Sequence, residues 1–133
     1  MSDGPDYVSR IMSDPSQVNG RETNDLLNTM YDGNAVELLG DLLHHEDRRV
    51  QSAGRFILSE LDPSQYPQIA HLWDEALSAS DPELQHAAAK AIYDHTVRNP
   101  KYLEGMIKLR GSQFEFLRTI AEDWIADYRT PFQ

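Results

Sequence analysis

Two consecutive segments repeat one pattern at a shift of 34 residues, and this constrains the fold more than any other feature of the chain. The first, 35–61, reads AVELLGDLLHHEDRRVQSAGRFILSEL, and the second, 69–95, reads IAHLWDEALSASDPELQHAAAKAIYDH. In both, apolar residues recur at helical spacing on either side of a turn that ends in an aspartate, Asp47 or Asp81. Each segment therefore predicts two helices joined by a turn, and the fixed period predicts stacked helical repeats.

The remaining sequence extends this pattern into a single domain predicted over residues 1–133. Asp62-Pro63 and Asn99-Pro100 each predict the start of a new helical segment. In chain order the predicted parts are two N-terminal cap helices that end at Asp32-Gly33-Asn34, two clear repeats, a degenerate third repeat and a tail, over residues 1–33, 34–62, 63–98, 99–128 and 129–133. No useful stretch alternates apolar and polar residues with a period of two. The fold class is therefore all-α, a short α-solenoid of about three helical hairpins with an N-terminal helical cap.

Small residues gather on one face of the second helix of each clear repeat. That face is predicted to pack on the first helix, where small side chains let two backbones approach closely; the residues are Ala53, Gly54, Ala87, Ala88 and Ala91. The same count places His95 at the edge of the apolar face, at the position that Leu61 takes in the first repeat. We expect this histidine to be a hydrogen-bonded residue of the core edge.

The charge of the chain limits the classes of partner. Its 12 Lys and Arg against 22 Asp and Glu give a formal net charge of −10. Nucleic acids and anionic membrane surfaces attract proteins of the opposite charge, so we expect neither as a partner. An acidic surface favours rapid encounter with a basic protein. The chain has no cysteine and no apolar run of membrane-spanning length, and its N-terminal residues do not resemble a secretory signal, so we expect a soluble, cytoplasmic protein.

The leucines, the aspartate of the turn, and the pattern x-x-V/L-x-x-A-A-x-A-I that follows resemble HEAT-like repeats, including the short bacterial kind seen in phycobilisome-lyase-type proteins. The residues that carry the resemblance are Leu39, Leu42, Leu43, Asp47, Val50, Ala53 and Ile57, and then Trp73, Leu77, Asp81, Pro82, Leu84, Ala87, Ala88, Ala91 and Ile92. It covers about residues 34–128 and implies an α-solenoid. A tetratricopeptide-like pairing is the alternative, because the 34-residue period matches that family.

The densest cluster of candidate metal ligands is His44-His45-Glu46-Asp47. HEAT-like deoxyhypusine hydroxylases hold two iron ions with several His-Glu pairs, and this chain offers one such pair, His45-Glu46. Because that ligand count is too low, we expect no metal, no other cofactor and no catalytic residues. A metal-dependent enzyme of the His-Glu type is the least favoured reading.

The second helices of an α-solenoid commonly line its binding face. Counting 100° per residue places nine residues outward on the three predicted second helices: Ser52, Arg55, Ser59, His86, Ala89, Tyr93, Thr119, Glu122 and Ala126. Tyr93 and Phe56 are the candidate aromatic anchors for a partner, because exposed aromatic residues are common hot spots. With their polar and acidic neighbours, the predicted partner-binding residues are Arg55, Phe56, Ser59, Glu60, His86, Tyr93, Asp94, Glu122 and Asp123.

These observations favour a non-catalytic protein–protein interaction module that binds a basic protein. The most specific form of this hypothesis is a bacterial immunity protein, which neutralises a toxin, often a cationic nuclease, by covering its active site. The alternative is an adaptor or scaffold that binds through shape and apolar contacts on its concave face. Salt separates the two, because electrostatic steering weakens with ionic strength and apolar docking does not.

Overall fold

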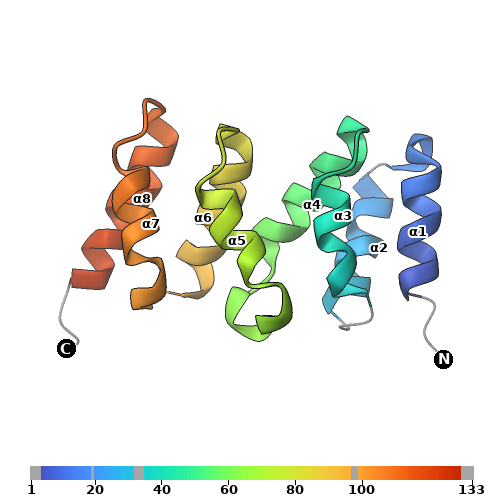
Figure 1. The fold of residues 1–133 in the computed structure, drawn as a ribbon, viewed down its shortest axis with the longest axis horizontal. Helices are drawn as coiled ribbons and strands as arrows, with labels where there is room; N and C mark the ends of the chain where they lie inside the picture. The colour runs from blue at the N-terminus through green and yellow to red at the C-terminus, as the bar shows by residue number, and fades with distance from the viewer. Residues whose placement is uncertain (1–3, 19, 32–34, 97–98, 130–133) are drawn as a thin grey trace. The chain divides into compact units, whose positions relative to one another are not determined.

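The computed structural model describes residues 4–18, 20–31, 35–96 and 99–129 (Figure 1). Over these residues the chain forms eight α-helices and five short 3-10 helices, and no β-strand. The all-α class predicted from the sequence is therefore confirmed for the described part of the chain. The predicted break at Asp32-Gly33-Asn34 and tail residues 130–133 lie outside the described residues.

Residue contacts group the chain into two compact units, Met1–Leu61 and Asp62–Gln133. The boundary between the units lies within one residue of the boundary predicted between the first and second repeats. The single domain predicted over residues 1–133 stays a prediction. Unit 1 contains α1 (Gly4–Ser13), η1 (Pro15–Gln17), α2 (Gly20–Tyr31), η2 (Val36–Leu38), α3 (Leu39–Leu43) and α4 (Arg48–Glu60). Unit 2 contains η3 (Pro63–Gln65), η4 (Pro67–Ile69), α5 (His71–Leu77), α6 (Pro82–His95), η5 (Pro100–Tyr102), α7 (Leu103–Leu109) and α8 (Glu115–Arg129).

Three pairs of consecutive helices pack against each other, α3 on α4, α5 on α6 and α7 on α8. The aspartates of the first two turns cap the second helix of their pair, as the sequence predicts. The Asp47 carboxylate accepts a hydrogen bond from the Arg49 backbone N–H at 2.8 Å, and the Asp81 carboxylate accepts one from the Glu83 N–H at 2.9 Å. The side-chain hydrogen bond from Arg49 holds the pKa of the Asp47 carboxyl below its ordinary value.

The first helix of repeat 1 is shorter than predicted. The sequence predicts one helix over about 35–44, whereas the structure forms η2 and then the five-residue α3. Neither element has a side-chain hydrogen bond at its N-cap. A tighter 3-10 turn satisfies some of the backbone groups that an uncapped helix end leaves unpaired, and this accounts for the difference.

The core of unit 1 joins α1 and α2 to the first repeat. Val8 of α1 and Leu26 and Met30 of α2 are fully buried, and α2 contacts both α1 and α4. His45, in the turn after α3, connects the repeat to the end of α1. Its Nδ1 accepts a hydrogen bond from the Asp47 backbone N–H at 3.0 Å, so in the neutral ring Nε2 carries the proton and donates it to the Met12 carbonyl oxygen, also at 3.0 Å. This histidine therefore has a structural role.

The core of unit 2 is built from two hairpins with their equivalent helices in contact, since α5 contacts α7 and α6 contacts α8. Trp73, Ile92, Met106 and Trp124 are all fully buried between these helices and their turns. Trp124 stacks on Tyr128, with 5.3 Å between the ring centroids. At a shift of 33 residues, the large indole of Trp124 occupies the position that Ala91 has in the second repeat.

In all three pairs, the side chain at one matched position of the second helix donates a hydrogen bond to a backbone carbonyl oxygen near the end of the first helix. The Gln51 side-chain amide donates to the His45 carbonyl oxygen. The Gln85 amide donates to the Leu77 carbonyl oxygen at 3.1 Å, and Arg118 donates to the Ser112 carbonyl oxygen at 3.0 Å. Because each bond satisfies a carbonyl near the end of the first helix, it holds the two helices of the pair at their turn.

The small residues of α4 and α6 are buried, as predicted. Ala53, Ala87, Ala88 and Ala91 are at most 6% exposed. At Gly54 the close approach of α3 is direct: a Cβ there would lie 3.1 Å from the Leu42 Cβ and 3.1 Å from the Leu43 backbone nitrogen. Gly54 therefore allows α3 to approach α4 more closely than any larger residue would.

Three sequence-based placements are wrong. His95 is exposed, because α6 has 14 residues and α4 has 13; Thr96 instead takes the buried end position, where its hydroxyl donates to the Ile92 carbonyl oxygen at 2.7 Å. Ala89, counted as outward, is fully buried on a helix that packs against α8. Ser59, also counted as outward, is only 8% exposed, and its short side chain donates to the Phe56 carbonyl oxygen of its own helix at 2.6 Å.

Candidate partner-binding surface

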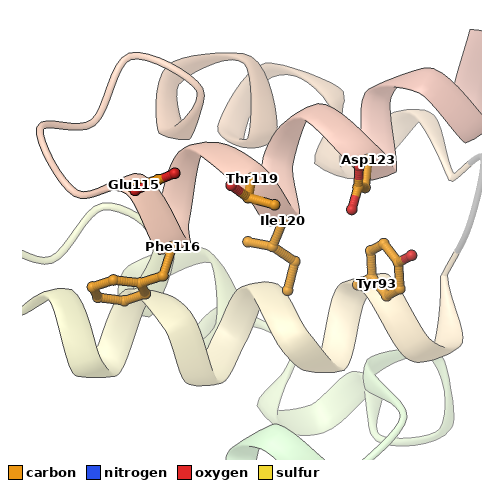
Figure 2. A pocket seen from close by; sticks show the side chains of 6 residues that line it. All are labelled: Tyr93, Glu115, Phe116, Thr119, Ile120 and Asp123. Atoms are coloured by element: carbon orange, nitrogen blue, oxygen red, sulfur yellow. The ribbon is translucent and has the colours of Figure 1, made fainter.

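A surface hollow of about 690 Å³ lies along the contact between α6 and α8 in unit 2. We call it the α6–α8 hollow and define it by its lining residues: Tyr93, Glu115, Phe116, Thr119, Ile120 and Asp123. Figure 2 shows Phe116, Ile120 and Tyr93 in a row where the two helices meet, with Asp123 close to the Tyr93 ring. Tyr93 comes from α6, and the other five residues come from α8.

The local sequence explains why a hollow forms here. Ala89 of α6 is fully buried and α6 packs against α8, so a small side chain at this position is compatible with a close approach of the two helices. Larger side chains, Tyr93 on α6 and Phe116 on the first turn of α8, stand at the two ends of the row in Figure 2. Ile120 forms the floor between them, because its side chain points towards α6 and is only partly exposed.

The aromatic end of the hollow has defined contacts. Phe116 is 46% exposed. Its ring meets the His86 ring edge to face, with 5.5 Å between centroids and 69° between planes, and lies 5.8 Å from the Phe114 ring. These contacts restrict the Phe116 side chain while part of its ring faces solvent. A partner that covered it would bury apolar surface at little cost in side-chain entropy.

The charge of the hollow has one sign. Glu115 and Asp123 are both exposed, and the described residues of the lining include no lysine or arginine. Lys90, elsewhere on α6, forms an ion pair with Asp94 at 3.1 Å, one helical turn along. An apolar floor with carboxylates beside it can accept an apolar side chain flanked by lysine or arginine.

The structure brings together some of the predicted partner-binding residues of unit 2. Tyr93 and Asp123 line the hollow, and His86 contacts its aromatic end. Glu122 is exposed on α8 but is not part of the lining, and Asp94 is engaged by Lys90.

The predicted residues of unit 1 lie on α4. Phe56 is 37% exposed and lines a different hollow, between α2 and α4. Arg55 donates to the Ser52 hydroxyl at 3.2 Å, Ser59 is buried, and Glu60 is half-buried. They do not line the α6–α8 hollow.

Sequence reasoning missed four lining residues: Glu115, Phe116, Thr119 and Ile120 were not among the predicted partner-binding residues. Thr119 was among the residues predicted to face outward but not among the predicted partner-binding residues. Glu115 and Phe116 lie in the first turn of α8. The periodic apolar pattern of the third repeat begins at Leu117, so it does not include them. The sequence held a signal for Phe116. A shift of 33 residues aligns the third repeat with the second, and at that shift the aromatic Phe116 stands at the position of the charged Glu83, while Asp123 stands at that of Lys90.

The part of the chain that the structure describes holds no group of three or more His, Asp or Glu side chains arranged to bind a metal ion. Both ring nitrogens of His45, in the cluster singled out above, form hydrogen bonds. Among the described helices, none is long and apolar enough to cross a membrane. Comparison with protein-family models, with curated proteins and with solved structures found no match to this chain.

Proposed function

We propose that this protein is a non-catalytic interaction module that binds a basic protein partner through the α6–α8 hollow. The observation that carries the proposal is the composition of that hollow: a half-exposed Phe116, the partly exposed Tyr93 and Ile120, and two carboxylates with no cation among the lining residues that the structure describes. Buried aromatic anchors supply most of the energy of typical interfaces, and complementary charge supplies rate and specificity.

The most specific form of the proposal is a bacterial immunity protein that neutralises a basic toxin. A net charge of −10 supports it, because the whole-protein field would steer a cationic partner towards the surface before Glu115 and Asp123 contact it. The scaffold that we propose beneath this surface is a short α-solenoid of HEAT-like hairpins. The contacts of α5 with α7 and α6 with α8 support such stacking within unit 2.

An adaptor that binds chiefly through apolar contacts is the second candidate, and the exposure of Phe116 favours it. The two functions differ in what holds the partner. In the first, the carboxylates contribute much of the affinity at low salt, and in the second, the aromatic residues contribute nearly all of it.

The test is affinity capture from the source cell with the purified, tagged protein, with washes at low and at high salt. Three variants accompany the wild type: Glu115→Lys with Asp123→Lys, its control Glu122→Lys with Asp127→Lys, and Phe116→Ser. The control makes the same change in net charge on exposed positions of the same helix outside the hollow.

We expect one basic protein that is retained by the wild type at low salt and by the control, and lost from the other two variants. Inhibition of that protein's toxic activity by the wild type would support the immunity function. A partner that survives the high-salt wash and is lost only from the Phe116 variant would support the adaptor. Equal capture by all four proteins would refute a role for the hollow.

A further inference from the structure

A second hollow, of about 600 Å³, lies in unit 1 between α2 and α4. Its α4 wall consists of Arg48, Arg49, Ser52, Ala53 and Phe56, and α2 supplies the opposite wall with residues such as Thr23. We call it the α2–α4 hollow. It belongs to a different unit from the α6–α8 hollow and shares no residue with it.

The two hollows occupy the same place in the repeated unit. Each α4 wall residue has its counterpart 67 positions later, which is one repeat shift of 34 followed by one of 33. The counterparts are the five α8 residues of the other hollow: Glu115, Phe116, Thr119, Ile120 and Asp123. Two independent units thus form a hollow from identical helix positions, so the hollow is a property of how these hairpins pack.

The charge of the two hollows differs in sign, although only the first matched pair reverses it directly. Arg48 stands where the other hollow has Glu115, and Phe56 stands where it has Asp123. Within the described part of the chain, the lining of the α2–α4 hollow contains two arginines and no carboxylate, and that of the α6–α8 hollow contains two carboxylates and no cation. In a chain of net charge −10, a cation-lined hollow runs against the overall field.

The neighbouring contacts show which groups of the α2–α4 hollow can meet a ligand. Arg49 donates from Nε and Nη2 to the Asp47 carboxylate at 3.2 and 3.1 Å, so its charge is largely balanced within the protein. Arg48 is exposed at the first position of α4, and Phe56 is 37% exposed two turns along the same face. One cation and one aromatic ring, with apolar Ala53 between them, thus define the recognition surface.

We propose that the α2–α4 hollow binds an acidic segment of a partner protein, with an apolar side chain against Phe56 and a carboxylate facing Arg48. Charge complementarity selects this occupant over a basic one. A nucleic acid would also carry negative charge, but its affinity depends on many phosphate contacts, and the described lining offers only Arg48 and Arg49 for them. The proposal does not depend on the function of the α6–α8 hollow.

The test is an amide chemical-shift titration of the full, isotope-labelled chain with two short peptides. One peptide contains glutamate, leucine and phenylalanine, and the other has lysine at every glutamate position. The Arg48→Glu variant should fold, because an acidic residue is favourable in the first turn of a helix. Arg110→Glu, at an exposed residue after α7 in the other unit, makes the same charge change and serves as the control.

We expect the glutamate peptide to shift the amides of Thr23, Ser52 and Phe56. Its affinity should fall by about tenfold in Arg48→Glu, because a contact between unit charges in water changes from attraction to repulsion. The Arg110→Glu variant should bind within about twofold of the wild type. Absence of shifts in α2 and α4, or equal loss in both variants, would overturn the proposal. So would a titration in which single-stranded RNA shifts these amides and the glutamate peptide does not.

Discussion

Replacement of Gly54 by alanine tests the close packing of α3 on α4, on which the first hairpin depends. The new Cβ would lie 3.1 Å from the Leu42 Cβ, 3.1 Å from the Leu43 backbone nitrogen and 3.2 Å from the Leu42 carbonyl carbon. Two of these three atoms belong to the backbone and cannot rotate away. The helices must therefore separate by a few tenths of an ångström, and overpacking of this kind costs about 1–3 kcal/mol.

Helix propensity opposes this cost. Exchange of glycine for alanine inside a helix is worth about 1 kcal/mol in favour of alanine. We therefore expect Gly54→Ala to lower the free energy of unfolding by about 1 kcal/mol net. Gly105→Ala in α7 is the matched control. There the Cβ would approach only the Leu77 Cδ1, at 2.9 Å, and that methyl group can turn aside, so the propensity gain should leave this variant as stable as the wild type or more stable.

The measurement is urea unfolding followed by far-ultraviolet circular dichroism, with the slopes compared to confirm that the unfolded states are alike. We expect Gly54→Ala to be less stable than the wild type and Gly105→Ala to be at least as stable as the wild type. If Gly54→Ala gained as much stability as Gly105→Ala, α3 and α4 would not approach as closely as the structure indicates.

Three further predictions concern the core, the cap of α4 and the contact with α1. Trp124→Ala should lower the free energy of unfolding by about 3–5 kcal/mol in thermal or urea unfolding, because it removes a fully buried indole; a loss under 1 kcal/mol would contradict that burial. Asp47→Asn should be less stable than the wild type at neutral pH, and the difference should shrink as the pH falls below about 3.8. The sign follows from the pKa of Asp47, which the Arg49 hydrogen bond lowers: the stabilisation is complete above the ordinary pKa and is lost as the pH falls through the lowered one, so a difference independent of pH would refute it. His45→Ala should speed amide hydrogen exchange in α1, since the bond to the Met12 carbonyl oxygen is lost; unchanged exchange there would show that this bond does not hold α1.

The helices of this protein could be predicted because their signals are local. Asp47 and Asp81 accept hydrogen bonds from residues two positions along the chain, so the sequence alone marks those helix starts. The burial of Gly54 and Ala88 follows from their periodic placement on one face. Such features need no knowledge of the tertiary structure.

The features that could not be predicted depend on contacts between residues far apart in the chain, or on the exact residue at which a helix ends. In the sequence, His45 belongs to the densest cluster of candidate metal ligands. In the structure, its ring forms a hydrogen bond with the carbonyl oxygen of Met12, which lies 33 residues away. Ala89 was predicted to face outward, because the sequence of α6 alone does not reveal that α8 packs against this helix. His95 and Thr96 exchanged roles because α6 runs one residue further than α4, and helix ends are set by the surrounding structure as much as by sequence.

The candidate site was partly predictable for the same reason. Tyr93 was selected as an aromatic residue that faces away from the core of its own hairpin and Asp123 as an acidic neighbour, and both line the α6–α8 hollow. Phe116 was not selected, because its exposure depends on where α8 begins and on its contact with His86 across the two helices. The periodicity of one helix does not contain that information.

The central claim is that the α6–α8 hollow binds a basic partner, and one comparison tests it most directly. With the captured partner purified, its dissociation constant is measured at low salt for Asp123→Lys and for Glu122→Lys. These adjacent exposed residues of α8 differ in that only Asp123 lines the hollow. We predict that Asp123→Lys weakens binding by about tenfold or more and that Glu122→Lys changes it by no more than about twofold. Equal effects of the two substitutions would show that net charge, and not this hollow, determines binding.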